Sequence, residues 1–440
     1  MNTPICDFVK EYGKSGKVRA HMPGHKGIGD MELYDITEIP GADSLYEANG
    51  IIKESQQNAG ALFGADTFFS AEGSSLSIRA MLYLAAAYGK SRGREPIIIA
   101  ARNVHKSFVT AAALLDLQVE WLYPEEQECY LSCRVSPCVL EEKIKKYHPV
   151  AVYITSPDYL GNMQDIKGIG EVCKRNDVLL LVDNAHGAYL KFLPESAHPM
   201  DLGAHMCADS AHKTLPVLTG GAYLHINKDA PAFFKENAKA ALSLFGSTSP
   251  SYLILQSLDR ANTYLETHKR RLSGFLPKIQ GLKNALSGFG YTLIGDEPLK
   301  ITLSTKPYGY KGFVMAQLLE EKGIVCEFSD SDHLVLMLTQ ENSGDIEKII
   351  KAFAGVKKLP EIKEAPPTFE IPQKALSIRT AIFGDSEILP IEESLGKVVA
   401  DVSVGCPPAV PVLISGEVVD ATAIECFKYY GIKEIKVLKG

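Results

Sequence analysis

The stretch VLLLVDNAHG at residues 178–187 joins a continuous apolar run to a group of polar residues that begins at Asp183. Near-continuous runs of Val, Leu and Ile are typical of strands in a parallel sheet that helices cover on both faces. Ligands of such sheets bind at the carboxyl ends of the strands. Because Asp183 stands at that end of its run, we expect chemistry there, although a carboxylate in this position can also simply cap the next helix.

Four more short apolar runs surround this one in the sequence. They are PIIIA at 96–100, VEWLY at 119–123, VAVYIT at 150–155 and GAYLHI at 221–226. Segments of helix length separate them, which predicts an α/β fold with a mostly parallel sheet and helices on both of its faces. Two later runs, ITLST at 301–305 and HLVLML at 333–338, predict smaller α/β parts toward the C-terminus.

Changes in this pattern divide the chain into five predicted parts. The longest, residues 55–290, is a large domain that contains Asp183, and the stretch KEAPPTFEIPQ has the three prolines of a linker. The parts are an N-terminal segment at 1–54, the large domain at 55–290, a small α/β domain at 291–362, the linker at 363–373 and a C-terminal module at 374–440.

The composition excludes several classes of protein. With 440 residues, 46% of them apolar, the chain is globular, and its net charge of −7 gives no reason to expect a nucleic acid or an anionic membrane as partner. No apolar run approaches the ~18 residues that span a bilayer, and the first residues lack the apolar core of a signal peptide, so we expect a cytoplasmic protein. Cys129, Cys133 and Cys138 lack the spacing of a zinc site, so no metal is expected.

Asp183 gains significance from Lys213, which follows it by 30 residues in the stretch DSAHKTLPVLTGG at 209–221. A lone lysine of this kind is usually a surface residue. Pyridoxal 5'-phosphate, however, needs a lysine to hold its aldehyde and an acid to keep its ring nitrogen protonated. The pair therefore indicates a pyridoxal-phosphate site.

Two further motifs suit the same cofactor. Gly73, Ser74 and Ser75 precede an apolar pattern of helical period, where a helix N-terminus with hydroxyl groups can cradle a phosphate. A plain serine helix cap is the commoner explanation. His105 follows the run PIIIA and could stack on a flat ring, although a hydrogen-bonded loop histidine is an equally good interpretation.

With these pieces in order, the chain resembles the ornithine/lysine/arginine decarboxylase family of fold type I pyridoxal-phosphate enzymes, whose fold is like that of aspartate aminotransferase. The resemblance covers nearly the whole chain, and its most specific motifs are D-x-A-H-G and S-x-H-K at this spacing. The matching stretches are HMPGHKG (21–27), GADSLYEANGII (41–52), FFSAEGSS (68–75), ARNVHKS (101–107), TSPDYLGNMQDI (155–166), LLVDNAHGAY (180–189), DSAHKTLPVLTGG (209–221) and CPPAVPVLISGE (406–417).

The resemblance implies a role for each matching residue. Lys213 would be the Schiff-base lysine, Asp183 the partner of the pyridine nitrogen, and His105 the residue stacked on the ring. Ala185 would pack under the ring, and His186 would lie near its phenolic oxygen. The phosphate would be held by Gly73, Ser74, Ser75, Ser210 and His212.

The chain also departs from the family pattern. It has Ser75 where the family often has Thr, Ser44 where a second acid is usual, Cys406 where a Tyr is usual, and Ala409 where a Gly is usual. The N-terminal wing domain of the large inducible members, on which their decamers depend, has no counterpart here. The resemblance implies a homodimer in which the loop at 21–27 lies near the partner's active site.

The expected reaction is decarboxylation of a basic L-amino acid, with arginine ahead of lysine and ornithine. Asp43, Glu47 and Glu417 are candidates for binding the cationic end of the substrate, and Glu417 is the first choice because its turn would lie at the pocket mouth. Lys213 and His212 are both candidates for returning a proton to Cα. An aminotransferase that uses Arg379, another lyase, or a catalytically inactive regulatory homologue are the alternatives.

Overall fold

The computed structural model describes residues 1–124, 130–368, 370–401 and 408–439. Its contacts divide the chain into two compact units, each assembled from segments that are far apart in sequence. The first unit comprises Met1–Pro96, His148–Ile154 and Ile166–Arg271, and the second comprises Ile97–Tyr147, Thr155–Asp165 and Leu272–Gly440. Cys129 and Cys406, which the sequence analysis considered, lie outside the described residues.

The largest sheet has seven strands in the order β1-β7-β6-β5-β4-β2-β3. The pairs β2–β3 and β5–β6 are parallel, whereas β7 runs antiparallel to both of its neighbours, β1 and β6. The prediction of an α/β fold with a mostly parallel sheet is therefore confirmed. The first unit contains β1 (Asp66–Ser70), β4 (Ala151–Thr155), β5 (Leu179–Asp183), β6 (Met206–Asp209) and β7 (Ala222–Ile226), except that the last residue of β4, Thr155, is counted with the second unit. The second unit contains β2 (Ile97–Ala101) and β3 (Gln118–Leu122).

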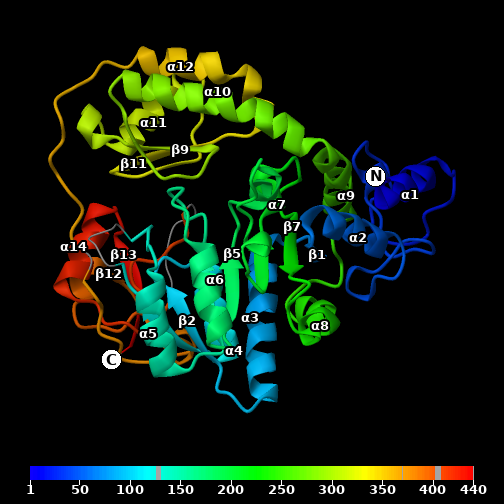
Figure 1. The fold of residues 1–440 in the computed structure, drawn as a ribbon, viewed down its shortest axis with the longest axis horizontal. Helices are drawn as coiled ribbons and strands as arrows, with labels where there is room; N and C mark the ends of the chain where they lie inside the picture. The colour runs from blue at the N-terminus through cyan, green and yellow to red at the C-terminus, as the bar shows by residue number, and fades with distance from the viewer. Residues whose placement is uncertain (125–129, 369, 402–407, 440) are drawn as a thin grey trace. The chain divides into compact units, whose positions relative to one another are not determined.

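Helices surround the strands of the first unit, as Figure 1 shows. The long helix α3 packs against β6 and β7 and against α8, and α2 packs against β1 and α9. The helices of this unit are α1 (Pro4–Lys14), α2 (Ile51–Phe63), α3 (Gly73–Ser91), α6 (Ile166–Arg175), α7 (Ala211–Thr214), α8 (Ala232–Ser243) and α9 (Tyr252–Glu266).

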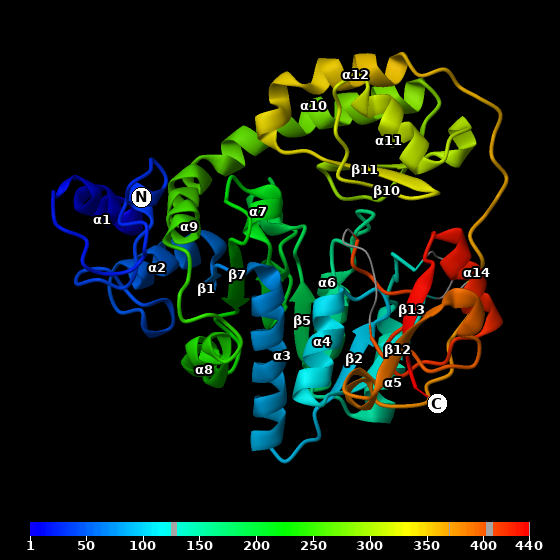
Figure 2. The same cartoon turned by 180° about the vertical axis from the view of Figure 1, so that it is seen from behind.

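The second unit holds two smaller sheets. One has four strands in the order β10-β11-β9-β8, and α11 packs against β10 and β11. Figure 2 shows α10, α11 and α12 on one side of this sheet. The other sheet pairs β12 with β13 near the C-terminus. The strands are β8 (Thr292–Ile294), β9 (Lys300–Ser304), β10 (Phe328–Ser329), β11 (His333–Met337), β12 (Ser386–Pro390) and β13 (Glu434–Leu438). The helices are α4 (Lys106–Leu115), α5 (Pro137–Tyr147), α11 (Gly312–Glu320), α12 (Ile346–Ala354), α13 (Ile378–Ile382), α14 (Ala421–Tyr429) and, from Leu272 onward, α10 (His268–Gly288).

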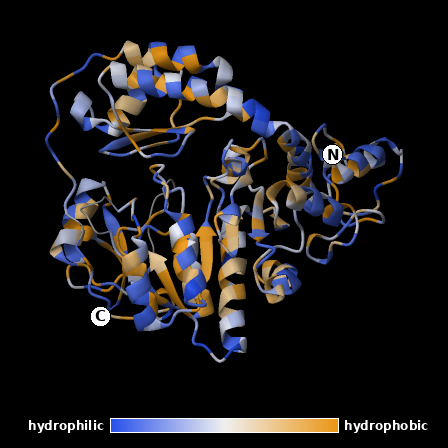
Figure 3. Cartoon of the chain, viewed as in Figure 1, coloured by the Kyte–Doolittle hydropathy of each residue, from blue (hydrophilic) through white to orange (hydrophobic). Residues whose placement is uncertain are grey.

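The core of the first unit lies along its central strands. Every residue of β5, β6 and β7 is buried, and Figure 3 shows these strands as largely hydrophobic. Burial of apolar surface at about 25 cal/mol per Å² is the main source of stability for such a sheet. The few polar side chains inside it, among them Asp183, Asp209 and His225, therefore need explanation.

Five of the seven strands of the large sheet lie within about two residues of the predicted apolar runs. Strands β1 and β6 were not predicted, because their sequences DTFFS and MCAD contain polar residues. Both strands are recognised in the structure through their pairing with β7.

No helix within the described part of the chain is both long enough and apolar enough to cross a membrane.

The division of the chain into five parts, expected from the sequence pattern, stays a prediction.

Candidate functional site

Asp183 ends β5 and is 2% exposed. One of its oxygens accepts a hydrogen bond from the Tyr153 hydroxyl at 3.1 Å, and the other accepts from the Ala185 amide at 3.2 Å. Burial raises the pKa of Asp183 above its ordinary value, and the positive charge of Lys213 opposes that rise. Burial and the Asp183 charge also raise the pKa of Tyr153, so this tyrosine acts as a donor to the carboxylate.

Lys213 lies in the short helix α7, directly after β6. Its Nζ is 3.1 Å from Nε2 of His186, and its backbone amide donates to the Ser210 carbonyl at 3.0 Å. His186 belongs to the turn that follows Asp183. The turn after β5 and the turn after β6 are therefore in direct side-chain contact, as expected for neighbouring parallel strands.

The predicted phosphate-binding residues come together at the start of α3. Gly73 adopts a positive φ of 73°, where a Cβ would be strained, and its amide donates to the Gly220 carbonyl at 2.7 Å. Ser210 donates to the Ser74 hydroxyl at 2.7 Å, which joins the end of β6 to the first turn of α3. The first amides of a helix have no acceptor within the helix, so this turn, which includes Ser75, can bind an anion.

His212 is hydrogen-bonded to Gly221, the residue just before β7. Its backbone amide donates to the Gly221 carbonyl at 3.1 Å, and its Nδ1 lies 3.0 Å from the same oxygen. This double contact orients the imidazole beside Lys213. It leaves His212 in place for either role that the sequence analysis considered.

The donor set fits pyridoxal phosphate. Asp183 is an almost completely buried carboxylate whose two donors, a hydroxyl and a backbone amide, are both neutral. A buried charge of this kind is stabilised by an opposite charge, and a protonated ring nitrogen would supply one. The same unit also offers an amine at Lys213 and an anion-binding helix start at Gly73.

His105 is described within the second unit, where it is the N-cap of α4. Its Nδ1 accepts from the Ser107 amide at 3.1 Å and lies 2.8 Å from the Ser107 hydroxyl. Since Nδ1 is an acceptor here, the neutral ring carries its proton on Nε2. His105 is therefore a hydrogen-bonded histidine, as one of its two interpretations stated. Stacking of its ring on the cofactor stays a prediction.

The carboxylate of Asp43 binds backbone amides near the start of α2, and a role in substrate binding stays a prediction. Asp43 is buried, and its two oxygens accept from the amides of Asn49, Gly50 and Ile52 at 2.8 to 3.1 Å. These amides lie at or just before the start of α2. The carboxylate therefore satisfies the free donors of that helix and interacts favourably with its dipole.

Glu417, the first choice for binding the substrate, is buried in an ion pair with Arg102, and its role toward the substrate stays a prediction. Glu417 is 3% exposed, and one oxygen accepts from both Arg102 Nη2 at 2.9 Å and the Ile414 amide at 2.7 Å. Burial raises the pKa of Glu417, and Arg102 opposes the rise. Arg102 also donates to the Val412 carbonyl, so the pair fastens the C-terminal proline-rich motif to the segment just before His105.

Glu417→Gln is expected to destabilise the chain by about 3–5 kcal/mol, because it leaves the buried guanidinium of Arg102 without its counter-charge. Urea unfolding of the variant and the wild type would measure this difference. A Glu417→Gln chain that unfolds at the wild-type urea concentration but has a raised KM would instead support the substrate-binding role.

Arg379, on which the aminotransferase alternative depended, caps a helix. Its Nη1 donates to the carbonyls of Ala113 and Leu114 at 2.9 and 3.2 Å, at the C-terminal end of α4. A cation is favourable at this position because of the helix dipole. The structure therefore provides a structural role for the residue that had suggested transamination.

Sequence analysis missed the residues that hold the Asp183 turn in shape. Tyr153 in β4 was seen only as part of an apolar strand, and Asn184 only as a letter of the motif. A Cβ on Gly187 would lie 2.0 Å from the side-chain oxygen of Asn184, which explains the glycine in D-N-A-H-G. Asn184 could have been noticed because it stands inside the D-N-A-H-G motif. Tyr153 could have been noticed as a polar-tipped residue in a mostly apolar strand.

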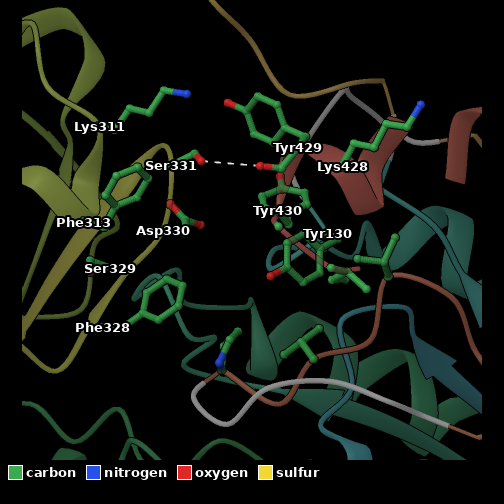
Figure 4. Close-up of a pocket in the computed structure, with 15 residues that line it drawn as sticks. Tyr130, Lys311, Phe313, Phe328, Ser329, Asp330, Ser331, Lys428, Tyr429 and Tyr430 are labelled. Carbon is green, nitrogen blue, oxygen red and sulfur yellow. Dashed lines mark hydrogen bonds between the residues drawn. The ribbon is translucent and has the colours of Figure 1, made fainter. Parts of the chain in front are cut away.

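A cavity of about 470 Å³ in the second unit contains none of the predicted site residues. Figure 4 shows its mixed lining, with aromatic rings such as Phe328 and Tyr430 and the basic side chains of Lys311 and Lys428. Its one acid, Asp330, accepts bonds from the amides of Asp332 and His333. This lining does not match the donor set at Asp183 and Lys213.

Comparisons with known proteins agree with this chemistry. The family model described as Orn/Lys/Arg decarboxylase, major domain, matches residues 3–288. The arginine decarboxylase of Halalkalibacterium halodurans is 31% identical over 95% of this chain and 91% of its own length. The arginine decarboxylase of Bacillus subtilis is 30% identical over the same shares of the two chains. Among solved structures, a lysine decarboxylase of Francisella novicida superposes with a TM-score of 0.81 at 17% identity, covering 99% of this chain and 81% of the other, and so shares the fold.

Proposed function

Because the chain belongs to the Orn/Lys/Arg decarboxylase family, we propose that it removes the α-carboxylate of a basic L-amino acid with bound pyridoxal 5'-phosphate. Arginine is the favoured substrate, ahead of lysine and ornithine. The proposal places the enzyme in the cytoplasm and its amine product at the entry to polyamine biosynthesis.

The observation that carries the proposal is the contact between the turns after β5 and β6. It brings an amine at Lys213 beside an imidazole at His186, in the same unit as the buried carboxylate of Asp183. The relatives named arginine decarboxylase align over nearly the whole chain, which supports arginine over the other basic amino acids.

Each residue of the site has a task that its surroundings suit. Lys213 would hold the aldehyde carbon, and His186 would orient that amine. Asp183 would hold the proton on the ring nitrogen, with Tyr153 and Ala185 fixing the direction of the carboxylate. The phosphate would lie at Gly73, Ser74, Ser75, Ser210 and His212, and His105 would stack on the ring.

The cofactor, when bound, supplies an electron sink for the pair that the Cα–carboxylate bond releases. Asp183 would supply a negative charge beside the ring nitrogen. Coulomb attraction to that charge favours the protonated nitrogen, and the protonated ring accepts electrons better than the neutral one. A proton must then reach Cα, and Lys213 and His212 are the two candidates for donating it.

The experiment that tests the substrate is a comparison of kcat/KM across amino acids with added pyridoxal phosphate. Arginine, lysine and ornithine should all exceed glutamate and tyrosine, with arginine highest. An acidic or aromatic amino acid that is decarboxylated faster than all three basic ones contradicts the proposal.

We also propose that the chain forms a homodimer through its N-terminal loop. The loop around residues 21–27 exposes large apolar side chains: Val18 is 90% exposed, Ile28 is 88% exposed, and Met22 and Met31 are also exposed. Clustered exposed apolar residues of this kind mark protein interfaces. A two-fold interface would bury the same patch on both copies.

Light scattering is expected to give twice the mass of the chain, and Val18→Asp with Ile28→Asp should shift the protein toward monomer because each copy would then bury two unpaired charges. Val325→Asp is a matched control, since Val325 is also strongly exposed but lies in the second unit. A wild-type monomer that stays fully active on dilution contradicts the dimer.

A further inference from the structure

A fully buried carboxylate lies one residue before the turn that holds Lys213. Asp209 is 0% exposed, and its Oδ2 accepts from Nε2 of His198 at 2.9 Å and from Nε2 of His225 at 3.2 Å. Its Oδ1 accepts from the side-chain amide of Asn184 at 2.7 Å. Three nitrogen donors from three separate segments therefore converge on one carboxylate, the Cys207 thiol also lies 3.8 Å from its Oδ1, and the mechanism above uses none of these groups.

Strand register explains how these residues meet. His225 in β7 pairs with Cys207 in β6 on one side and with Thr67 in β1 on the other. Paired residues share a face of the sheet, and Asp209, two residues after Cys207, lies on that same face. The Thr67 hydroxyl is 2.8 Å from Nδ1 of His225. The ring of Phe63 in α2 covers the group, with its centroid 4.4 Å from that of His225.

The carboxylate of Asp209 is held in its ionised form. Burial alone would raise the pKa of Asp209, but the two imidazoles hold that pKa below its ordinary value. Burial lowers the pKa of His225, and Nδ1 of His198 accepts from the Met200 amide, which places the His198 proton on Nε2. The carboxylate is thus ionised while fully buried, an arrangement that is costly unless every donor is in place.

Asn184 connects this buried charge to the candidate site. Its side-chain amide binds Asp209, its side-chain oxygen packs against Gly187, and its backbone amide donates to the Ala208 carbonyl at 3.0 Å. Asn184 stands between Asp183 and Ala185, so a side chain fixed on both sides also fixes the direction of its neighbours. On the other side, Asp209 is followed directly by Ser210, whose hydroxyl binds Ser74.

We propose that Asp209, with His198 and His225, is a positioning group that sets the relative placement of the two turns that bind the cofactor, one carrying Asp183 and the other Ser210 to Lys213. This inference rests on the proposed function, since it assigns a task within the same pyridoxal-phosphate site. It goes beyond that function by naming residues that do not touch the cofactor.

The test is the affinity and geometry of cofactor binding in Asp209→Asn, a variant of nearly unchanged shape. The cofactor-free full-length chain would be titrated with pyridoxal phosphate, and the visible circular dichroism of the bound cofactor would report its orientation. Asp209→Asn is expected to raise the dissociation constant at least tenfold and to alter the visible dichroism.

Thr67→Val is the matched control. It removes the hydroxyl that contacts His225 at the far side of the group and leaves the bond between Asp209 and Asn184 intact. It should lower the melting temperature of the cofactor-free chain but leave the dissociation constant and the dichroism unchanged. If Asp209→Asn lowers only the melting temperature in the same way, Asp209 is purely structural and the proposal fails.

Asn184→Ala keeps the proposal testable if Asp209→Asn does not fold. It removes a single hydrogen bond of the group and should reproduce the weaker binding and altered dichroism. Adding Asp209→Asn to Asn184→Ala should then have little further effect on the dissociation constant, because the two residues act through one contact. Additive effects would contradict action through Asn184.

A bound metal is a distinct outcome, because the ligand atoms of His198, Cys207 and Asp209 lie within 4.8 Å of one another. Stoichiometric metal in the purified wild-type chain would overturn the proposal in favour of a metal site. If the wild-type chain binds no pyridoxal phosphate, the proposed function fails. If it binds the cofactor and Asp209→Asn binds it equally well, only this inference fails.

Discussion

Lys213→Ala is expected to abolish the visible absorbance of covalently held pyridoxal phosphate and to reduce kcat by at least about 10³-fold, equivalent to about 4 kcal/mol. The reason is that Lys213 offers the amine that faces His186 and follows the Ser210 turn. Without that amine the aldehyde has no covalent attachment, and the reaction loses one of its two candidate proton donors to Cα. Absorbance spectra and steady-state kinetics measure the two effects.

Lys145→Ala serves as the control for Lys213→Ala. Lys145 lies on α5 and forms an exposed ion pair with Glu141, four residues earlier. Such pairs contribute little to stability, so both spectrum and kcat should remain at wild-type levels. Retention of the absorbance and activity by Lys213→Ala would show that another amine holds the cofactor.

Asp183→Asn has the second large expected effect, a loss of turnover without loss of cofactor. The amide keeps the size of the side chain but not its charge, so it cannot stabilise a protonated ring nitrogen in a buried site. A fall in kcat of at least about 10²-fold is expected, equivalent to about 2.7 kcal/mol. The cofactor should remain bound, because Lys213 and the phosphate-binding turn are unchanged.

Tyr153→Phe provides the graded comparison for Asp183→Asn. It removes one hydrogen bond to the carboxylate and leaves the charge in place. A single hydrogen bond contributes a net ~0.5–1.5 kcal/mol, so kcat should fall about tenfold at most. Near-normal turnover in Asp183→Asn, or a larger loss in Tyr153→Phe than in Asp183→Asn, contradicts the assigned role of the carboxylate.

The large sheet and the residues around Lys213 could be predicted because their signals are local. The run VLLLVD and the motif S-x-H-K each lie within a few residues, and the strand ends place them in neighbouring turns. Strands β1 and β6 could not be found in this way. Their sequences DTFFS and MCAD become strands through pairing with β7, which is a long-range interaction.

The surroundings of the candidate substrate acids could not be predicted, because the partner of a buried carboxylate can lie far away in the sequence. Arg102, which pairs with Glu417, lies 315 residues away in the sequence. Asp43 lies close to the helix whose first amides it binds, but its place in the N-terminal loop suggested only a candidate substrate acid. Asp209 went unnoticed for the same reason, since its partners extend from Asn184 to His225.

This chain is expected to release the α-carboxylate of arginine as CO₂ and to leave the remainder as an amine. A reaction with arginine labelled with ¹³C at its carboxyl carbon, in which gas and amine products are both quantified, measures this. One labelled CO₂ and one molecule of the decarboxylated amine should form per arginine consumed, with no keto acid. Label retained in a keto acid, or no release of labelled CO₂ from a chain that has bound pyridoxal phosphate, would contradict this expectation.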